Sequence, residues 1–352
     1  MIDIHFYRKI HGLKQSLMGG ATFEMDALKR AMEENRSPEP VIYNIETTNA
    51  CNMTCKMCPR TTMMTRPIQT LDMPTFERII DQIRPYSREE WNEWQDFAEK
   101  AYGVSRQGMS ENHFFLFVIP RVIVLHGYGD PLLDPLMPRR IKYMKDKGVP
   151  SYFSCNPANI DREKTLEMMK NGLGFIKYSI ESVDDSKHRE IRGKASNFSK
   201  SYESILEVIE DKEKHGLKTT IVITMLNLEK SGQGQEFARL VEAFAGKDVY
   251  IYLKSQDQLW YGEEEKETQS IHWQEFCQFP WSSITVKSDG KVAMCVEDFN
   301  NEIILGDARI EKLKDIWNGE KYEEFRRHHF EVKRGIKCSD QCDMKLIGQL
   351  IG

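Results

Sequence analysis

The sequence predicts an α/β protein: a partial (β/α)6 TIM-like barrel followed by a small β-hairpin-plus-helix domain. Six short β-rich runs alternate with stretches whose apolar residues recur every three or four positions, a pattern typical of parallel strands joined by crossover helices. This rhythm stops after the acidic stretch 262–267, where a hairpin signal replaces it. The 352 residues are enough for a barrel and an appended domain.

The first 40 residues are predicted to be a helical lead-in, because apolar residues with helical spacing around Met25 to Met32 precede a polar, proline-broken stretch at 33–40. The barrel is expected over residues 41–255. Its six strands are predicted at Val41–Glu46, Val122–His126, Ser151–Cys155, Phe175–Ile180, Thr219–Met225 and Val249–Lys254. The connection at about 84–120 is unusually long, so we expect an insertion that forms a lid, a substrate wall or a dimer contact.

Residues 256–352 are predicted to form the second domain. Strands at Ile284–Val286 and Lys291–Met294 flank Ser288-Asp289-Gly290, which is a strong signal for a β-hairpin. A helix is expected to follow from about Ile310 to His328.

Composition and charge exclude several classes of protein. The chain has 49 Lys and Arg against 54 Asp and Glu, and this net charge of -5 argues against nucleic acid as a partner. No run of about 18 apolar residues occurs, which argues against a membrane span. The first residues lack the order of a signal peptide, so the default expectation is a cytoplasmic location.

Eight cysteines carry the chemical information, and three of them lie close together at Cys51, Cys55 and Cys58. A structural zinc site would need a fourth ligand nearby, but no Cys or His occurs between Cys58 and His113. Three thiolates suit a 4Fe-4S cluster with one iron open to a substrate. The alternative is half of a zinc ribbon or a chance grouping.

A second group of cysteines lies late in the chain. Its members are Cys277, Cys295, Cys338 and Cys342. Four thiolates can saturate either a zinc ion or a 4Fe-4S cluster, and their spacing alone does not separate the two.

The first cysteine group, placed directly after a strand, resembles the signature of the radical S-adenosylmethionine (SAM) superfamily. The resemblance covers roughly residues 41 to 255, with Met57 where many members carry an aromatic residue. It implies that the open iron binds SAM and that SAM is cleaved reductively to a 5′-deoxyadenosyl radical, which takes hydrogen from the substrate. It also implies an external one-electron reductant of the flavodoxin or ferredoxin type.

Further residues match the family at the carboxyl ends of strands. The run from Gly127 to Pro131 is similar to the family's Gly-Gly-Glu-Pro motif, with an aspartate as its acid. The resemblance implies SAM contacts from Gly127, Gly129, Asp130, Asn156, Ser179 and Arg192. The alternatives are a plain turn for the glycines, and loop capping or surface ion pairs for the others.

The late cysteines and their surroundings resemble the SPASM domain in its shortened "twitch" form. The full form carries two auxiliary clusters, so four cysteines imply one, ligated entirely by protein and suited to electron transfer. The shortened form occurs in sugar and cyclitol alcohol dehydrogenases. Relatives with similar extensions modify peptides by oxidation, thioether formation or epimerisation.

Cys155 belongs to neither group and has two interpretations. It packs in the core, as free cysteines commonly do, or its thiol returns a hydrogen atom to a substrate radical and makes the enzyme an epimerase. His126 and His188 lie near the expected site, where either could act as a base, although a structural role is favoured for both.

The predicted function is a radical SAM oxidoreductase that oxidises a small substrate, such as a sugar or cyclitol, with the auxiliary 4Fe-4S cluster as electron acceptor. The alternatives are a peptide-modifying enzyme that forms thioethers or cross-links, and an epimerase that uses Cys155 as hydrogen donor.

Overall fold

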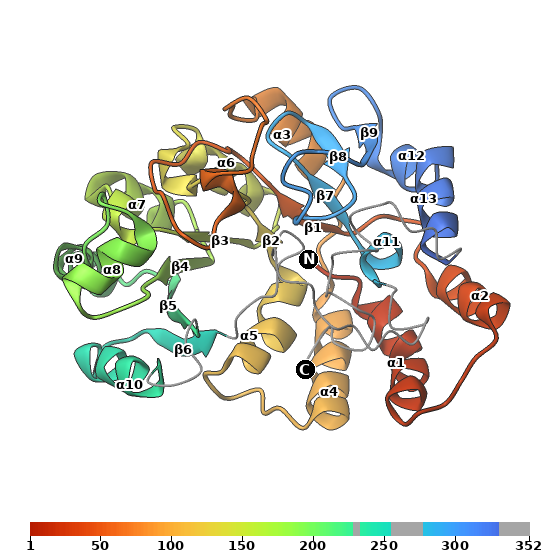
Figure 1. The fold of residues 1–352 in the computed structure, drawn as a ribbon, viewed down its shortest axis with the longest axis horizontal. Coiled ribbons are helices and arrows are strands. Elements are labelled where there is room, and N and C mark those ends of the chain that lie inside the picture. The colour runs from red at the N-terminus through yellow and green to blue at the C-terminus, as the bar shows by residue number, and fades with distance from the viewer. Residues whose placement is uncertain (228–232, 255–276, 331–352) are drawn as a thin grey trace.

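The computed structural model describes residues 1–227, 233–254 and 277–330. All six predicted barrel strands are present and parallel, in the order in which they occur along the chain (Figure 1). They are β1 Ile42–Ile45, β2 Ile123–Val124, β3 Ser151–Cys155, β4 Phe175–Ser179, β5 Thr220–Leu226 and β6 Tyr250–Lys254. Their carboxyl ends meet at one edge of the sheet, where the motif residues begin.

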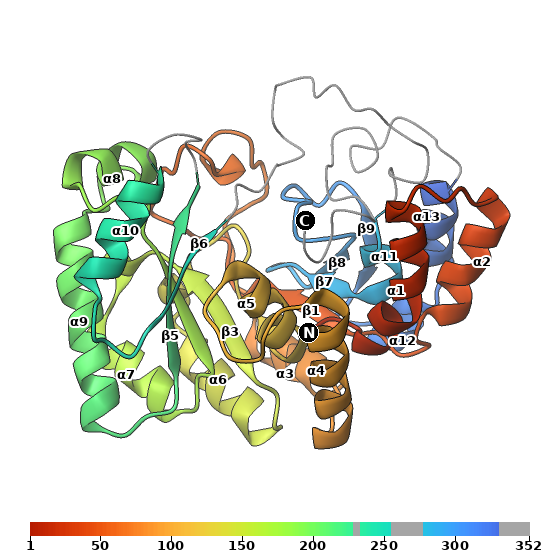
Figure 2. The same cartoon turned by 90° about the horizontal axis from the view of Figure 1, so that it is seen from below.

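The outer face of the sheet is covered by crossover helices, several of which line the left side of the molecule in Figure 2. These helices are α3 Met73–Ile80, α6 Met137–Asp146, α7 Arg162–Lys170, α8 Asp185–Arg192, α9 Phe198–Lys214 and α10 Gln233–Ala243. Alternate strand residues such as Phe153 and Ile176 pack against them. An Asp or Asn side chain accepts a hydrogen bond from the first turn of α3, α7, α8 and α9, which explains where these helices begin.

The inner face of the sheet packs against helices from two segments far apart in sequence. These are α1 Ile4–Met18 from the lead-in, and α4 Arg88–Tyr102 and α5 Glu111–Phe117 from the long connection. Phe114 contacts Tyr152 and Tyr252 of the sheet, and the indole of Trp94 is fully buried and donates to the Leu116 carbonyl at 2.7 Å. The connection thus supplies an inner layer of the barrel's core.

The C-terminal part continues the barrel sheet, which the sequence did not indicate. Strand β7 Ile284–Val286 pairs in parallel with β1, and β8 Lys291–Ala293 and β9 Ile304–Asp307 follow as antiparallel strands. The predicted hairpin is therefore confirmed, but β9 was missed. The predicted helix at Ile310–His328 is two helices, α12 Leu313–Trp317 and α13 Glu320–Phe330, because the chain turns at Asn318-Gly319.

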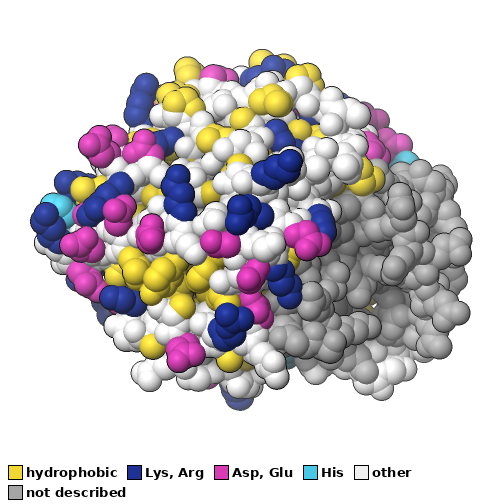
Figure 3. Space-filling model, turned by 60° about the vertical axis from the view of Figure 1, so that its left-hand side comes forward, with side chains coloured by type: hydrophobic (Ala, Val, Ile, Leu, Met, Phe, Trp, Pro, Cys, Tyr) yellow, Lys and Arg dark blue, Asp and Glu magenta, His cyan; other side chains and the backbone are white. Residues whose placement is uncertain are grey.

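The remaining elements are short or peripheral. They are α2 Met25–Asn35, α11 Phe279–Ser282, and the 3-10 turns η1 Pro59–Thr61, η2 Ile119–Arg121, η3 Pro131–Leu133 and η4 Pro157–Asn159. On the face drawn in Figure 3, positive and negative side chains are interspersed. In the part of the chain that the structure describes, no helix is long and apolar enough to cross a membrane.

Candidate active site

The loop after β1 holds three half-buried or buried thiols in close proximity. The Cys51 sulfur accepts a hydrogen bond from the Met53 amide at 3.4 Å, and the Cys58 amide donates to the Cys55 carbonyl at 3.2 Å. Burial raises the pKa of Cys58 to about 11, and the neighbouring Cys55 and Cys51 sulfurs add to this effect. The predicted ligands are thus brought together in one loop.

The end of α8 docks onto this cysteine loop. The Lys56 amide donates to the Ile191 carbonyl at 3.0 Å, and the Thr54 amide donates to the Arg192 carbonyl at 3.3 Å. Gly193 follows with φ +100°, and a Cβ there would lie 2.3 Å from the Thr54 hydroxyl oxygen. Only glycine therefore permits this close approach of helix and loop.

The loop supplies the number and type of ligands that a 4Fe-4S cluster with one open iron uses. Among the described residues, no three His, Cys, Asp or Glu side chains converge on a point that could hold one metal ion. A zinc ion would need its thiolates at about 2.3 Å from one centre, whereas a 4Fe-4S cluster takes each thiolate on a different iron. Three separate thiols in one loop match the second arrangement.

The glycines of the second motif are required by contacts with the end of β1. A Cβ on Gly127 would lie 2.6 Å from the Glu46 carboxylate, and one on Gly129 would lie 2.2 Å from the Thr48 carbonyl. The Asp130 carboxylate is buried and accepts hydrogen bonds from the Leu132 amide at 3.0 Å, the Asn156 amide at 3.1 Å and the Asn159 side chain at 2.7 Å. Asp130 therefore joins the ends of β2 and β3, a contact that the sequence did not reveal.

Two of the predicted SAM contacts carry buried donors that lack a partner among the described residues: Asn156 Nδ2 and Arg192 Nε. Arg192 also points its Nη1 at the Cys55 sulfur, 3.8 Å away, and pairs with the buried Glu181 carboxylate. Buried donors of this kind need acceptors, and SAM offers ribose and carboxylate oxygens. The residues present thus fit SAM beside the cysteine loop.

Polar side chains line the inner face of the sheet near its carboxyl edge. The hydroxyl oxygens of Ser154 and Ser179 lie 3.3 Å apart. Lys177 lies two residues before Ser179 on β4 and therefore on the same face of the sheet. His126 Nδ1 accepts the Ser154 amide at 3.0 Å. Burial, together with the charges of Lys177 and Lys254, lowers the pKa of His126 to about 3. The alternation on β4 could have revealed Lys177, which the sequence analysis missed.

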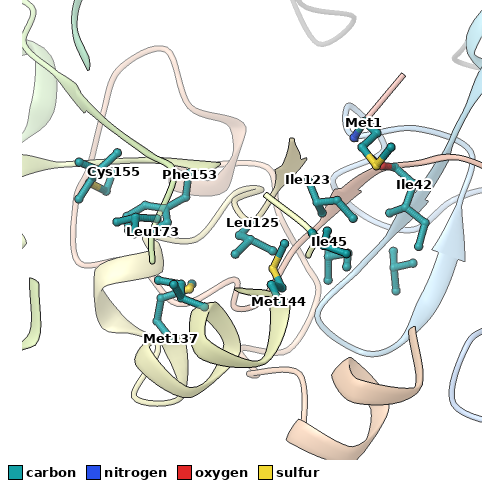
Figure 4. Close-up of a cluster of buried hydrophobic side chains, with 14 of the residues drawn as sticks. Met1, Ile42, Ile45, Ile123, Leu125, Met137, Met144, Phe153, Cys155 and Leu173 are labelled. Atoms are coloured by element: carbon teal, nitrogen blue, oxygen red, sulfur yellow. The ribbon is translucent and has the colours of Figure 1, made fainter. Parts of the chain in front are cut away.

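Cys155 and His188 lie away from this inner face. Figure 4 shows Cys155 in the hydrophobic cluster with Phe153 and Leu173, where its side chain is 6% exposed and its sulfur lies 3.6 Å from the Lys177 carbonyl. The imidazole of His188 is fully buried and contacts the Ser196 hydroxyl at 2.8 Å. Both side chains are therefore buried away from the inner face of the sheet.

The second cysteine group is described in part. The Cys277 sulfur accepts the Phe279 amide at 3.4 Å, and the Cys295 sulfur accepts the Glu297 amide at 3.3 Å. The same amide-to-sulfur pattern, two residues apart, occurs at Cys51. Amide donors to sulfur are a feature of iron-sulfur sites, so these two thiols fit such a group. Cys338 and Cys342 lie outside the described residues.

Comparison with known proteins defines the class. Residues 45–241 match the sequence model of the radical SAM superfamily, and residues 277–343 match that of SPASM, an iron-sulfur cluster-binding domain. The chain belongs to the radical SAM superfamily, which confirms the predicted resemblance. It is a radical SAM enzyme that binds a 4Fe-4S cluster and SAM, with a SPASM domain for auxiliary iron-sulfur binding.

Individual relatives match most of the chain at low identity. The chain is 22% identical over 303 residues to the S-adenosyl-L-methionine-dependent 2-deoxy-scyllo-inosamine dehydrogenase of Niallia circulans, covering 86% of this chain and 90% of that protein. Streptococcus suis SuiB bound to S-adenosylmethionine is similar in structure, with TM-score 0.53, 13% identity, and 91% of this chain and 78% of SuiB covered. For anSMEcpe with bound AdoMet the TM-score is 0.51 at 16% identity, with coverage of 86% and 88%. The structural likenesses show the fold.

Proposed function

We propose that the protein is a radical SAM dehydrogenase that oxidises an alcohol carbon of a small sugar-like or cyclitol substrate. The observation that carries this proposal is the similarity to the Niallia circulans dehydrogenase, which extends over both modules and nearly the full length of that protein. The count of four late cysteines, enough for one auxiliary cluster, also supports it.

Cys51, Cys55 and Cys58 would hold the SAM-binding cluster in this proposal. When bound, the cluster and SAM together supply an electron and a 5′-deoxyadenosyl radical that takes a hydrogen atom from carbon. The chain's contribution would be to orient SAM, because the buried donors Asn156 Nδ2 and Arg192 Nε would donate to its oxygens. A flavodoxin or ferredoxin is proposed as the external reductant.

The polar inner face would bind the substrate. Because His126 Nδ1 accepts a backbone N–H, its lone pair is used there and the neutral ring carries its proton on Nε2. The lowered pKa keeps the ring neutral at physiological pH. His126 would therefore donate a hydrogen bond to a substrate oxygen from Nε2, and we assign it an orienting role in place of the base considered from the sequence. Lys177, on the same face, would supply a second donor.

The four late cysteines, Cys277, Cys295, Cys338 and Cys342, would hold one auxiliary 4Fe-4S cluster. With four protein thiolates such a group has no iron open to substrate, and it suits acceptance of the second electron of an alcohol oxidation. An auxiliary acceptor of this kind supports a net two-electron oxidation, and the mass of the product distinguishes that reaction from a redox-neutral epimerisation.

The test is the mass of the product. The reconstituted full chain, supplied anaerobically with SAM and reductant, is incubated with a panel that begins with 2-deoxy-scyllo-inosamine and includes related cyclitols, sugars and small peptides. We expect a cyclitol or sugar product lighter by two hydrogens. No mass change with deuterium uptake from solvent would show an epimerase, and a cross-linked peptide would show the peptide-modifying alternative; either result contradicts the proposal.

A further inference from the structure

Tyr128 links the SAM-binding motif to the auxiliary module. It lies between Gly127 and Gly129, yet its hydroxyl donates a hydrogen bond across to Glu297 Oε2 at 2.9 Å. The amide of Glu297 in turn donates to the Cys295 sulfur at 3.3 Å. Two hydrogen bonds and one residue thus connect the motif beside SAM with a thiol of the second cysteine group.

The backbone amide of Tyr128 hydrogen-bonds to the buried carboxylate of Glu46. The Tyr128 amide donates to Glu46 Oε1 at 3.1 Å, and Glu46 Oε2 accepts from the Ser288 amide at 3.1 Å and the Ser288 hydroxyl at 3.0 Å. Glu46 is fully buried and pairs with Arg66 at 2.8 Å. Because Ser288 belongs to the turn between β7 and β8, this pair joins the two modules at the base of Tyr128.

The side chain of Tyr128 is held by the loop that follows Cys295. Its ring lies edge-on to Phe299 with centroids 5.8 Å apart, and Lys287 Nζ lies 5.7 Å from the ring centroid. Lys287 also donates to the Val296 carbonyl at 2.8 Å, and Arg66 Nε donates to the Phe299 carbonyl at 2.7 Å. These contacts hold the ring of Tyr128, so the ring should keep its place when the hydroxyl is removed.

The charge at Glu297 affects any redox group at Cys295. Reduction adds negative charge to the cluster, so a nearby carboxylate lowers its reduction potential. A hydrogen-bond donor to that carboxylate reduces the carboxylate's effect and therefore raises the potential. We propose that Tyr128 is a positioning residue that holds the Cys295 loop against the SAM-binding motif and raises the reduction potential of the auxiliary cluster. The inference rests on the proposed function, because it takes Cys295 as a cluster ligand.

The test measures the potential of the auxiliary cluster directly. The full chain with Cys51, Cys55 and Cys58 replaced by Ala is reconstituted, so that an EPR-monitored redox titration reports the auxiliary cluster alone. In this background we expect Tyr128→Phe to shift the midpoint potential to a more negative value. We expect Glu297→Gln, which removes the carboxylate charge, to shift it to a more positive value.

A matched control removes a tyrosine hydroxyl elsewhere. Tyr143 donates to Asp81 at 2.8 Å on the surface of α6, and Tyr143→Phe is expected to leave the potential unchanged. A purely structural role for Tyr128 would not give shifts of opposite sign for the two site variants. An unchanged potential in Tyr128→Phe, or shifts of the same sign, would overturn the inference.

The same titration separates this inference from the proposed function. If the parent triple variant shows a 4Fe-4S signal but the two site variants do not shift its potential as expected, the inference is wrong. The assignment of an auxiliary cluster is then still supported. If the parent shows no such signal, the cluster assignment itself is wrong, and the inference is refuted with it. Since Tyr128→Phe keeps the ring that packs on Phe299, the variant should retain the fold.

Discussion

Arg192 combines several contacts in one buried side chain. It approaches the Cys55 sulfur, pairs with Glu181 and leaves Nε without a partner among the described residues. Its motif position predicted a role beside SAM, but sequence gave no sign of Glu181 or Cys55 as neighbours. Such contacts depend on how α8 docks, because the residues come from different loops of the sheet's carboxyl edge.

Cys155 gives the first prediction at the residue scale. Because its sulfur lies in the outer core and not on the inner face, we expect Cys155→Ala to lower the free energy of unfolding by about 1 kcal/mol. The identity of the product should not change. Denaturant unfolding and product mass spectrometry check the two parts, and a variant that turns a redox-neutral product into an oxidised or aborted one would support the hydrogen-donor role instead.

His188 gives a pH-dependent prediction. Burial, with the charge of Arg192, lowers its pKa to about 4. The unfolded ring, with pKa about 6.5, therefore binds its proton first as pH falls, so stability is lost below pH 6.5 and continues to fall toward pH 4. From pH 7 to pH 5 the loss from this one group should be about 2 kcal/mol.

The measurement compares wild type with His188→Asn by urea unfolding at pH 7 and pH 5. Asparagine cannot titrate in this range, so the variant should lose less stability on acidification than wild type does. Equal losses in the two proteins would show that His188 contributes nothing to the acid sensitivity.

At the scale of elements, the sequence predicted where the strands lie better than which strands pair with one another. All six barrel strands were expected within a few residues of their observed ends, because apolar β-branched runs between turn residues are a local signal. The pairing of β7 with β1 was not predictable in this way, since it depends on a contact between segments more than 230 residues apart. Strand β9 was missed because its run Ile304–Asp307 is short and ends in Gly-Asp.

The docking of α8 on the cysteine loop gives the element-scale prediction. Gly193→Ala adds a methyl group against Thr54 at a positive φ, so we expect a loss of more than about 2 kcal/mol in stability, together with loss of the SAM-binding cluster. Gly216→Ala is the control, because Gly216 also has positive φ but faces open space. It should cost about 1 kcal/mol and leave the cluster intact.

Iron analysis and denaturant unfolding of the two glycine variants provide the check. If Gly193→Ala retains its full iron content and matches Gly216→Ala in stability, the docking of α8 does not hold the cysteine loop.

At the scale of the molecule, the two predicted domains share one sheet. Nine strands run without interruption from β6 to β9, and one hydrophobic core extends from the crossover helices to α12 and α13. The division into modules was visible in the sequence as two cysteine groups. The continuity of the sheet and core across the two modules was not visible in the sequence. It depends on the buried Glu46–Arg66 pair and on β7, which pairs with the distant strand β1.

Because the sheet and the core are continuous, we expect the described residues of both modules to unfold together. Arg66→Met removes one cation from the buried Glu46 carboxylate, which keeps its hydrogen bonds from Ser288 and Tyr128, so the change should cost about 2 to 3 kcal/mol in the free energy of unfolding. Because the pair lies between β1 and the β7–β8 turn, wild type and variant should each unfold in one cooperative transition followed by tryptophan fluorescence and circular dichroism. Separate transitions for the two probes would contradict a shared core.

The most direct test of the central claim is the iron content of the chain with each cysteine group removed. The anaerobically reconstituted wild type should hold about eight irons. Replacing Cys51, Cys55 and Cys58 by Ala should leave about four irons and abolish SAM cleavage, whereas replacing Cys277, Cys295, Cys338 and Cys342 should leave about four irons with SAM cleavage intact. About four irons in the wild type, or zinc in place of iron at the late cysteines, would contradict the account.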